Sequence, residues 1–189
     1  MPQQLPLPGF HLPERPTEAR IARTALSRYP DVLPDDLCTH AKILGLAGEH
    51  LVDCVLAMFG ERAIPTPEHE QFDRIVWLDQ RLLRVQIKTR HVLGAGGYVF
   101  NVRRGYQRGP VGTRPYDPGD FDVLALVALP EFVVKFTAEW RPSHVVSAAE
   151  IPRLRRQPRA SFDTALNALG LADAVPDPAP DTTPGTAAA

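Results

Sequence analysis

The sequence predicts a mixed α/β domain of the α+β kind, and three observations support this fold class. Apolar residues recur at helical spacing over Thr39–Phe59. Two strand-like runs, Phe72–Leu78 and Leu82–Thr89, lie so close together that they indicate a β-hairpin. The apolar run Phe121–Leu129 indicates a strand that is buried on both faces. A helix followed by a hairpin and further strands is typical of a sheet covered by helices.

The ends of the chain differ in composition from its middle. Residues 1–38 are expected to form an N-terminal arm and a short helix, because residues 1–16 contain five prolines and Thr17 can cap a helix to about Tyr29. Pro30 and Pro34 are expected to end that helix. We expect one compact domain at 39–170 and a disordered tail at 171–189, where Pro, Asp, Thr and Ala dominate.

The main helix combines an apolar stripe with two internal glycines. Its predicted buried side consists of Ile43, Leu44, Ala47, Leu51, Val55 and Met58. Gly45 and Gly48 each cost about 1 kcal/mol relative to alanine in a helix. One interpretation is that another group approaches the backbone closely just before Glu49, and the alternative is that the helix merely tolerates them.

Three further elements are expected after the hairpin. Tyr98–Arg103 is predicted as a third strand, and Phe132–Phe136 as an edge strand that Pro130 separates from the buried one. Ser161–Leu169 is predicted as a last helix that Gly170 closes.

Charge is segregated along a chain whose formal net charge is −1. Gln80–Tyr116 contains no Asp or Glu. Its basic residues are Arg81, Arg84, Lys88, Arg90, Arg103, Arg104, Arg108 and Arg114. Such segregation favours one positive face and phosphate partners, with a merely solvated basic surface as the alternative. Among these residues we expect phosphate contacts from Arg90, Arg103, Arg104 and Arg108.

Composition also bears on compartment and on metal chemistry. The two cysteines are too few for a disulfide framework, the start lacks a secretory pattern, and the apolar run Val123–Leu129 is too short to span a bilayer. We therefore expect a soluble, cytoplasmic protein with no membrane partner. The residues Cys38, His40, His50 and Cys54 offer zinc-type ligands, but their spacing is looser than that of most structural zinc sites.

The chemistry-bearing residues gather around the predicted hairpin. Side chains alternate between the faces of a strand, so Gln86 and Lys88 point together, away from the apolar Val85 and Ile87. In a hairpin centred near Asp79-Gln80, Asp73 lies across from Gln86 and Lys88. A helix packed on that face would add Glu49 to the same patch.

That patch has the groups that phosphodiester hydrolysis requires. Mg²⁺ prefers hard oxygen ligands, which Asp73, the Gln86 amide and the Ile87 carbonyl can supply. Glu49 would bind the metal or hold the attacking water. Lys88 would orient the water or neutralise charge in the transition state.

At these residues the chain resembles the PD-(D/E)xK nuclease superfamily. The matching motifs are Gly48-Glu49, Asp73 in Phe-Asp-Arg-Ile-Val, and Gln86-Ile-Lys88 in Arg-Val-Gln-Ile-Lys-Thr. Together with Tyr116-Asp-Pro-Gly-Asp-Phe-Asp-Val-Leu, they resemble the branch of group I intron homing endonucleases and resolvase-like proteins. The resemblance covers roughly residues 40–140. It implies a restriction-endonuclease-like central mixed sheet flanked by helices, Mg²⁺- or Mn²⁺-dependent DNA cleavage, and often homodimers or homotetramers.

One residue departs from that pattern, because Gln86 stands where the superfamily usually has Asp or Glu. The sequence therefore predicts a metal-dependent endonuclease acting on DNA, with Glu49, Asp73, Gln86 and Lys88 as its catalytic residues and Glu49, Asp73 and Gln86 as metal ligands. The alternatives are a nuclease-fold DNA-binding module that is catalytically weak or inactive, and a domain whose basic stretch meets an acidic protein.

Overall fold

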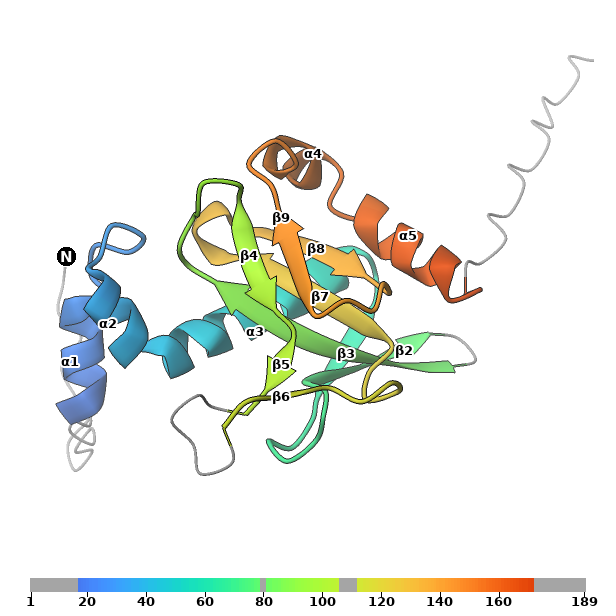
Figure 1. The fold of residues 1–189 in the computed structure, drawn as a ribbon, viewed down its shortest axis with the longest axis horizontal. Helices are drawn as coiled ribbons and strands as arrows, with labels where there is room; N and C mark the ends of the chain where they lie inside the picture. The colour runs from blue at the N-terminus through green and yellow to red at the C-terminus, as the bar shows by residue number, and fades with distance from the viewer. Residues whose placement is uncertain (1–16, 79–80, 106–111, 172–189) are drawn as a thin grey trace, which may run out of the picture.

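A mixed five-stranded sheet forms the centre of the molecule (Figure 1). The computed structural model describes residues 17–78, 81–105 and 112–171. The strand order is β1-β2-β3-β7-β8. The strands are β1 Arg62–Pro65, β2 Arg74–Leu78, β3 Arg81–Arg90, β7 Val123–Ala128 and β8 Val133–Thr137. β3 and β7 are parallel and the other neighbours are antiparallel, which confirms the mixed α+β fold class.

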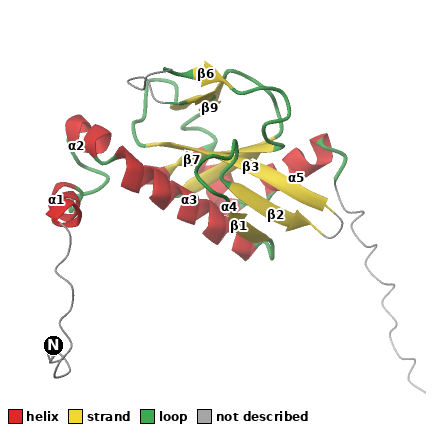
Figure 2. Cartoon of the chain, turned by 90° about the horizontal axis from the view of Figure 1, so that it is seen from below, coloured by secondary structure: helices red, strands yellow, loops and turns green. Residues whose placement is uncertain are grey.

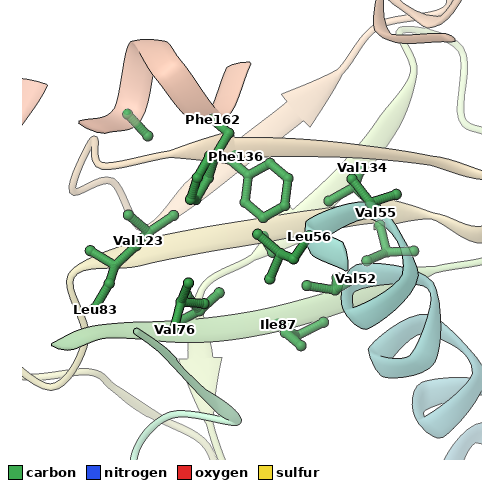
Figure 3. Close-up of a cluster of buried hydrophobic side chains, with 14 of the residues drawn as sticks. Val52, Val55, Leu56, Val76, Leu83, Ile87, Val123, Val134, Phe136 and Phe162 are labelled. Carbon is green, nitrogen blue, oxygen red and sulfur yellow. The ribbon is translucent and has the colours of Figure 1, made fainter. Parts of the chain in front are cut away.

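Helices cover one face of this sheet (Figure 2). α3 (Ala41–Met58) and α5 (Ala160–Ala168) both contribute to the first hydrophobic core. Figure 3 shows Val52 and Leu56 of α3 beside Val76 and Ile87 of the sheet, with Phe136 and Phe162 in the same core. Burial of these apolar side chains is the main source of stability in such a layer.

Two short strand pairs lie over the opposite face of the sheet (Figure 2). β4 (Tyr98–Asn101) pairs with β9 (Ser143–Val146), and β5 (Arg103–Arg104) pairs with β6 (Arg114–Pro115). A second core forms here between the aromatic side chains of β4 and the outer side chains of β7 and β8. Because β7 lies between the two cores, all six of its residues are buried, as its unbroken apolar sequence predicts.

The remaining helices lie toward the two ends of the described chain. They are α1 Thr17–Ala25, α2 Pro34–Thr39 and α4 Ile151–Arg156. α1 starts at the predicted Thr17 but ends before Tyr29. Pro30 and Pro34 were expected to end the first helix, but α1 already ends at Ala25. Pro34 instead begins α2, because a proline at the first helical position loses no hydrogen bond.

The buried side of α3 differs from the predicted one. The buried residues are Leu44, Gly48, Val52, Val55 and Leu56. Ile43 and Met58, which were predicted to be buried, are 49% and 66% exposed. The predicted side was wrong because it was chosen from apolar side chains alone. One contact position of this helix is Gly48, which carries no hydrophobic side chain.

Several element predictions are confirmed and others needed correction. The hairpin, the edge strand and the last helix are present as β2–β3, β8 and α5. The expected strand Tyr98–Arg103 is divided between β4 and β5, which pair with different partners, so it does not belong to the central sheet. β1, β9 and α4 were not predicted.

Some predictions concern residues outside the described ranges. They are the arm at 1–16, the hairpin connection at Asp79-Gln80, the phosphate contact Arg108 and the tail from residue 172 onward. The division into 1–38, 39–170 and 171–189 stays a prediction. Within the described ranges, no helix is long and apolar enough to cross a membrane.

Close packing explains one of the two glycines inside the main helix, Gly48. A Cβ atom at this position would lie 2.0 Å from the side-chain oxygen of Thr89 on β3, and 2.8 Å from its methyl carbon. The interpretation of a close approach just before Glu49 therefore holds for Gly48. At Gly45, no described atom outside the local backbone lies within 4 Å of such a Cβ, so close packing does not account for this glycine.

This difference gives a matched pair of stability variants. Gly48→Ala should lower the free energy of unfolding by about 1–3 kcal/mol, because the new methyl group forces α3 away from β3. Gly45→Ala should instead raise it by about 0.5–1 kcal/mol, because alanine is the better helix former. Urea unfolding monitored by circular dichroism measures both. The packing explanation is wrong if the two variants shift stability equally, or if adding Thr89→Ala fails to rescue Gly48→Ala.

Candidate active site

The candidate site lies where β2 and β3 separate. Their pairing ends with Arg74 opposite Val85, while β3 continues to Arg90 with β7 along its other edge. Asp73 lies just before β2, and its backbone N–H donates to the Val85 carbonyl at 2.9 Å. Within the described ranges, the edge of β3 beyond this point has no strand partner, so its main chain can bind side chains instead.

The carboxylate of Asp73 fills this gap. Its Oδ2 atom accepts a hydrogen bond from the Ile87 backbone N–H at 2.7 Å and another from the Gln86 amide nitrogen at 2.6 Å. The same amide nitrogen donates to the Ile87 carbonyl at 3.1 Å, and Gln86 is only 5% exposed. Two oxygen atoms, one from a carboxylate and one from a carbonyl, therefore converge on one buried point.

Lys88 lies on the same face of β3 as Gln86, as strand alternation predicts. Its ammonium donates to the Tyr116 hydroxyl at 2.8 Å and to the Arg103 carbonyl at 3.1 Å. It also lies 4.9 Å from the centre of the Tyr116 ring. Burial lowers the pKa of Lys88, and the nearby Asp73 carboxylate acts in the opposite direction.

Glu49 reaches the site from the other side of the sheet. We expected its helix on the face of Gln86 and Lys88, but α3 packs on the face of Val85 and Ile87. Glu49 nevertheless reaches the candidate site, because β3 has no strand partner along this edge in the described part of the chain. Glu49, Asp73, Gln86 and Lys88 all line one cleft of about 560 Å³.

A buried arginine holds the carboxylates of α3. The Arg74 guanidinium is 3.0 Å from Oε2 of Glu49 and 2.7 Å from Oδ1 of Asp53, and it also donates to the Asp73 carbonyl at 2.8 Å. Its side chain is 5% exposed, and those of Glu49 and Asp53 about a third. Arg74 therefore ties α3 to the residue that carries the central carboxylate.

Several charges act on Asp73 at once. Burial raises its pKa above the ordinary value, and the Glu49 carboxylate raises it further. The Ile87 N–H and the cations of Lys88 and Arg74 act in the opposite direction. A cation bound beside such a carboxylate stabilises its charged form, which offsets both the cost of burial and the repulsion from Glu49.

The predicted phosphate contacts differ in their surroundings. Arg90 and the Arg103 side chain are exposed near the cleft. Arg104 is largely covered and is paired with Asp117 at 2.7 Å and Asp120 at 3.3 Å. Arg90 and Arg103 are thus the freer candidates, although all of these contacts remain predictions.

The zinc alternative gains no support from the structure. Cys38 and Cys54 are both exposed. In the part of the chain that is described, no three or more His, Cys, Asp or Glu side chains are grouped to hold a metal ion. A cation in the cleft would accordingly need amide or main-chain oxygen atoms besides the carboxylates.

Two parts of this arrangement were not predicted from the sequence. Tyr116 was noted only as the first residue of the Tyr116-Asp-Pro-Gly-Asp-Phe-Asp-Val-Leu motif, whereas its hydroxyl contacts Lys88. Arg74 and Asp53 were not noted at all. A usable signal was present, because Glu49 and Asp53 are four residues apart on one helix and repel each other without a cation between them.

Two comparisons with known proteins give a match. The sequence model of a family described as PD-(D/E)XK endonuclease matches residues 50–161, which is more than half of the chain. Among solved structures, a bacterial homing endonuclease, I-Ssp6803I, is similar with a TM-score of 0.48 and 17% identity over 56% of this chain and 76% of its own. No curated protein sequence matches.

The role of Arg74 can be tested by substitution. Arg74→Met should lower the free energy of unfolding by about 3 kcal/mol, because Glu49 and Asp53 then lose their buried cation. Arg141→Met should cost at most about 1 kcal/mol, because its partner Glu139 and the arginine itself are exposed. Urea unfolding compares the two variants. Similar losses would mean that Arg74 is not the charge that fixes α3 to β2.

Proposed function

Because the chain belongs to the PD-(D/E)XK endonuclease family, we propose that it hydrolyses DNA phosphodiester bonds with Mg²⁺ or Mn²⁺ in the cleft of Glu49, Asp73, Gln86 and Lys88. One observation carries this proposal. The Asp73 carboxylate and the Ile87 carbonyl converge on one point beside the ammonium of Lys88. A hard cation and a phosphate would both find opposite charge there.

The residues present fit a hard divalent cation. Asp73 offers a carboxylate whose pKa is raised by burial and by the neighbouring Glu49, and Ile87 offers a main-chain carbonyl. Gln86 can turn its amide so that the oxygen replaces the nitrogen at the shared point, and Glu49 adds a second carboxylate at the rim of the cleft. When bound, the cation supplies a water-derived nucleophile near neutral pH and stabilises charge on the phosphoryl oxygens.

Lys88 is suited to stabilise the transition state. Tyr116 and the Arg103 carbonyl hold its ammonium in place, so little reorganisation is needed when negative charge develops on a phosphate. Because the ammonium is largely withdrawn from water, its attraction to that charge is weakly screened.

Glu49 is suited to hold the attacking water or a metal-bound water. Arg74 fixes one carboxylate oxygen of Glu49 at 3.0 Å, which orients the carboxylate toward the cleft that Asp73 also lines. Arg90 and Arg103, and to a lesser degree Arg104, would then bind phosphates of the DNA backbone.

One observation favours a second candidate function, a DNA-binding module without turnover. The amide nitrogen of Gln86 already donates to both oxygen atoms that a cation would use. A site closed in this way needs no metal to satisfy its polar groups. Such a module would bind DNA with a steep salt dependence and would not cleave it.

Substitution of Lys88 separates the two candidates. Lys88→Met should reduce cleavage of plasmid DNA in Mg²⁺ or Mn²⁺ by about 100-fold or more, because it removes a charge that acts in the transition state. Lys135→Met is the matched control, since Lys135 lies on β8 and pairs with Glu150. Equal cleavage by wild type, Lys88→Met and Asp73→Ala would point to a contaminating nuclease and would refute the assignment.

Gln86→Glu tests the cation site, because the substitution should lower stability without Mg²⁺ and increase the stabilisation that Mg²⁺ gives. In EDTA this variant should be less stable than wild type, because two carboxylates then face each other where the amide and Asp73 were 2.6 Å apart. The deficit should shrink as pH falls, since repulsion and burial raise the pKa of such carboxyls and protonation removes the repulsion. Mg²⁺ should raise the melting temperature more in Gln86→Glu than in wild type. A deficit that Mg²⁺ leaves unchanged would rule out a cation at this point.

A further inference from the structure

Tyr116, whose hydroxyl contacts Lys88, also lines a second cleft. This cleft measures about 410 Å³, which lies within the roughly 300–1,000 Å³ of small-molecule sites. Its lining includes Asn101, Arg103, Tyr116, Trp140, Arg141 and Ser143. We refer to it as the Trp140 cleft.

The indole of Trp140 forms an aromatic wall of this cleft. It stacks on Phe121 with ring centres 5.0 Å apart and an angle of 28° between the planes. Phe121 in turn meets Tyr116 edge to face at 5.2 Å. One indole face lies on Phe121, yet Trp140 is 46% exposed, so the exposed area belongs to its other face and its edges. An aromatic face held in this way resembles the stacking platforms of single-stranded nucleic-acid sites.

The cleft is directly connected to the candidate catalytic residue Lys88. Tyr116 lines it and contacts the Lys88 ammonium through both its hydroxyl and its ring. Arg103 accepts a hydrogen bond from Lys88 with its carbonyl and also lines the same cleft. A nucleotide bound against Trp140 would thus lie in a cleft that shares Tyr116 and Arg103 with the surroundings of the Lys88 ammonium.

Two guanidinium groups complete the chemistry of the cleft. Arg103 is exposed and donates to the Thr113 carbonyl at 3.1 Å, and Arg141 is exposed beside its partner Glu139. Guanidinium groups bind phosphates and also stack on bases. Two of them beside a free aromatic face are suited to one base and its flanking phosphates.

From these observations we propose that the Trp140 cleft binds an unpaired base of the DNA substrate, stacked on Trp140, with its phosphates on Arg103 and Arg141. The proposal rests on the proposed function for the identity of the substrate as DNA. It narrows the substrate class to DNA with a single-stranded or branched segment beside the scissile bond. A base within a continuous duplex must first leave its stack, which costs a few kcal/mol.

The chain contains two tryptophans, which makes the test selective. Trp77→Phe leaves Trp140 as the sole tryptophan, and Trp140→Phe leaves Trp77, which is 61% exposed on β2. Both proteins are titrated in EDTA with a thymidine oligonucleotide and with a blunt duplex. The oligonucleotide should quench the fluorescence of Trp77→Phe and leave that of Trp140→Phe nearly unchanged, while the duplex should quench the former much less.

Affinity provides a second readout. Trp140→Ala should weaken binding of the oligonucleotide by roughly 5- to 150-fold, the range for loss of one stacked base, while Trp77→Ala should bind as wild type does. Equal quenching in both single-tryptophan proteins, or equal affinity of Trp140→Ala and wild type, would overturn the proposal. Quenching by the duplex as strong as that by the oligonucleotide would overturn it as well.

These outcomes are separable from failure of the proposed function. The titrations need neither metal nor cleavage, so selective quenching without any Lys88-dependent cleavage would leave a DNA-binding module that holds an unpaired base. Cleavage without selective quenching would retain the endonuclease and remove the base site. Trp140→Phe keeps an aromatic ring on Phe121, so its near-ultraviolet circular dichroism verifies that the fold is intact.

Discussion

The hydrogen bond from the Ile87 backbone N–H to the Asp73 carboxylate is the interaction on which the candidate site depends. β2 ends its pairing with β3 at Arg74, and an N–H group left unpaired in a largely buried strand costs about 1–3 kcal/mol. The Asp73 carboxylate accepts from this N–H group, so the edge of β3 has no strand partner here among the described residues and its N–H group is nevertheless hydrogen-bonded. The opening lets the Ile87 carbonyl and the Gln86 amide turn toward one point, which a regular ladder would not permit.

A charge arrangement follows from that opening. Asp73 and Arg74 are neighbours in the chain, and Arg74 lies on the face of the sheet that α3 covers. Its guanidinium binds Glu49 and Asp53 of α3 and the carbonyl of Asp73. The helix is therefore fixed to the start of β2 by a buried cation, and Gly48 permits close approach to Thr89 one residue before Glu49. Packing and charge together determine where Glu49 lies.

Local patterns in the sequence predicted the parts of the site that depend on one strand or one hairpin. Alternation along β3 predicted that Gln86 and Lys88 share a face, and the hairpin register predicted that Asp73 lies opposite them. The sequence did not reveal which face α3 covers, because alternation defines two faces without saying what packs on either. The pairing of β4 with β9 was missed for a related reason. Some forty residues separate the two strands, and such pairing depends on tertiary contacts that neither strand encodes alone.

Gln86 is best understood through the charges around it. Glu49, Asp53 and Asp73 face Arg74 and Lys88, so three carboxylates are set against two cations without any metal. A glutamate at position 86 would add a fourth carboxylate within hydrogen-bonding distance of Asp73, in a place where burial already disfavours the charged form. The amide instead donates to Asp73 and Ile87, and the site is satisfied without a cation. The same neutrality weakens attraction for a divalent ion, since one ligand charge is missing. The glutamine thus satisfies the polar groups of the site without a metal, and a cation at the proposed position would first have to displace the Gln86 amide nitrogen from Asp73 and Ile87.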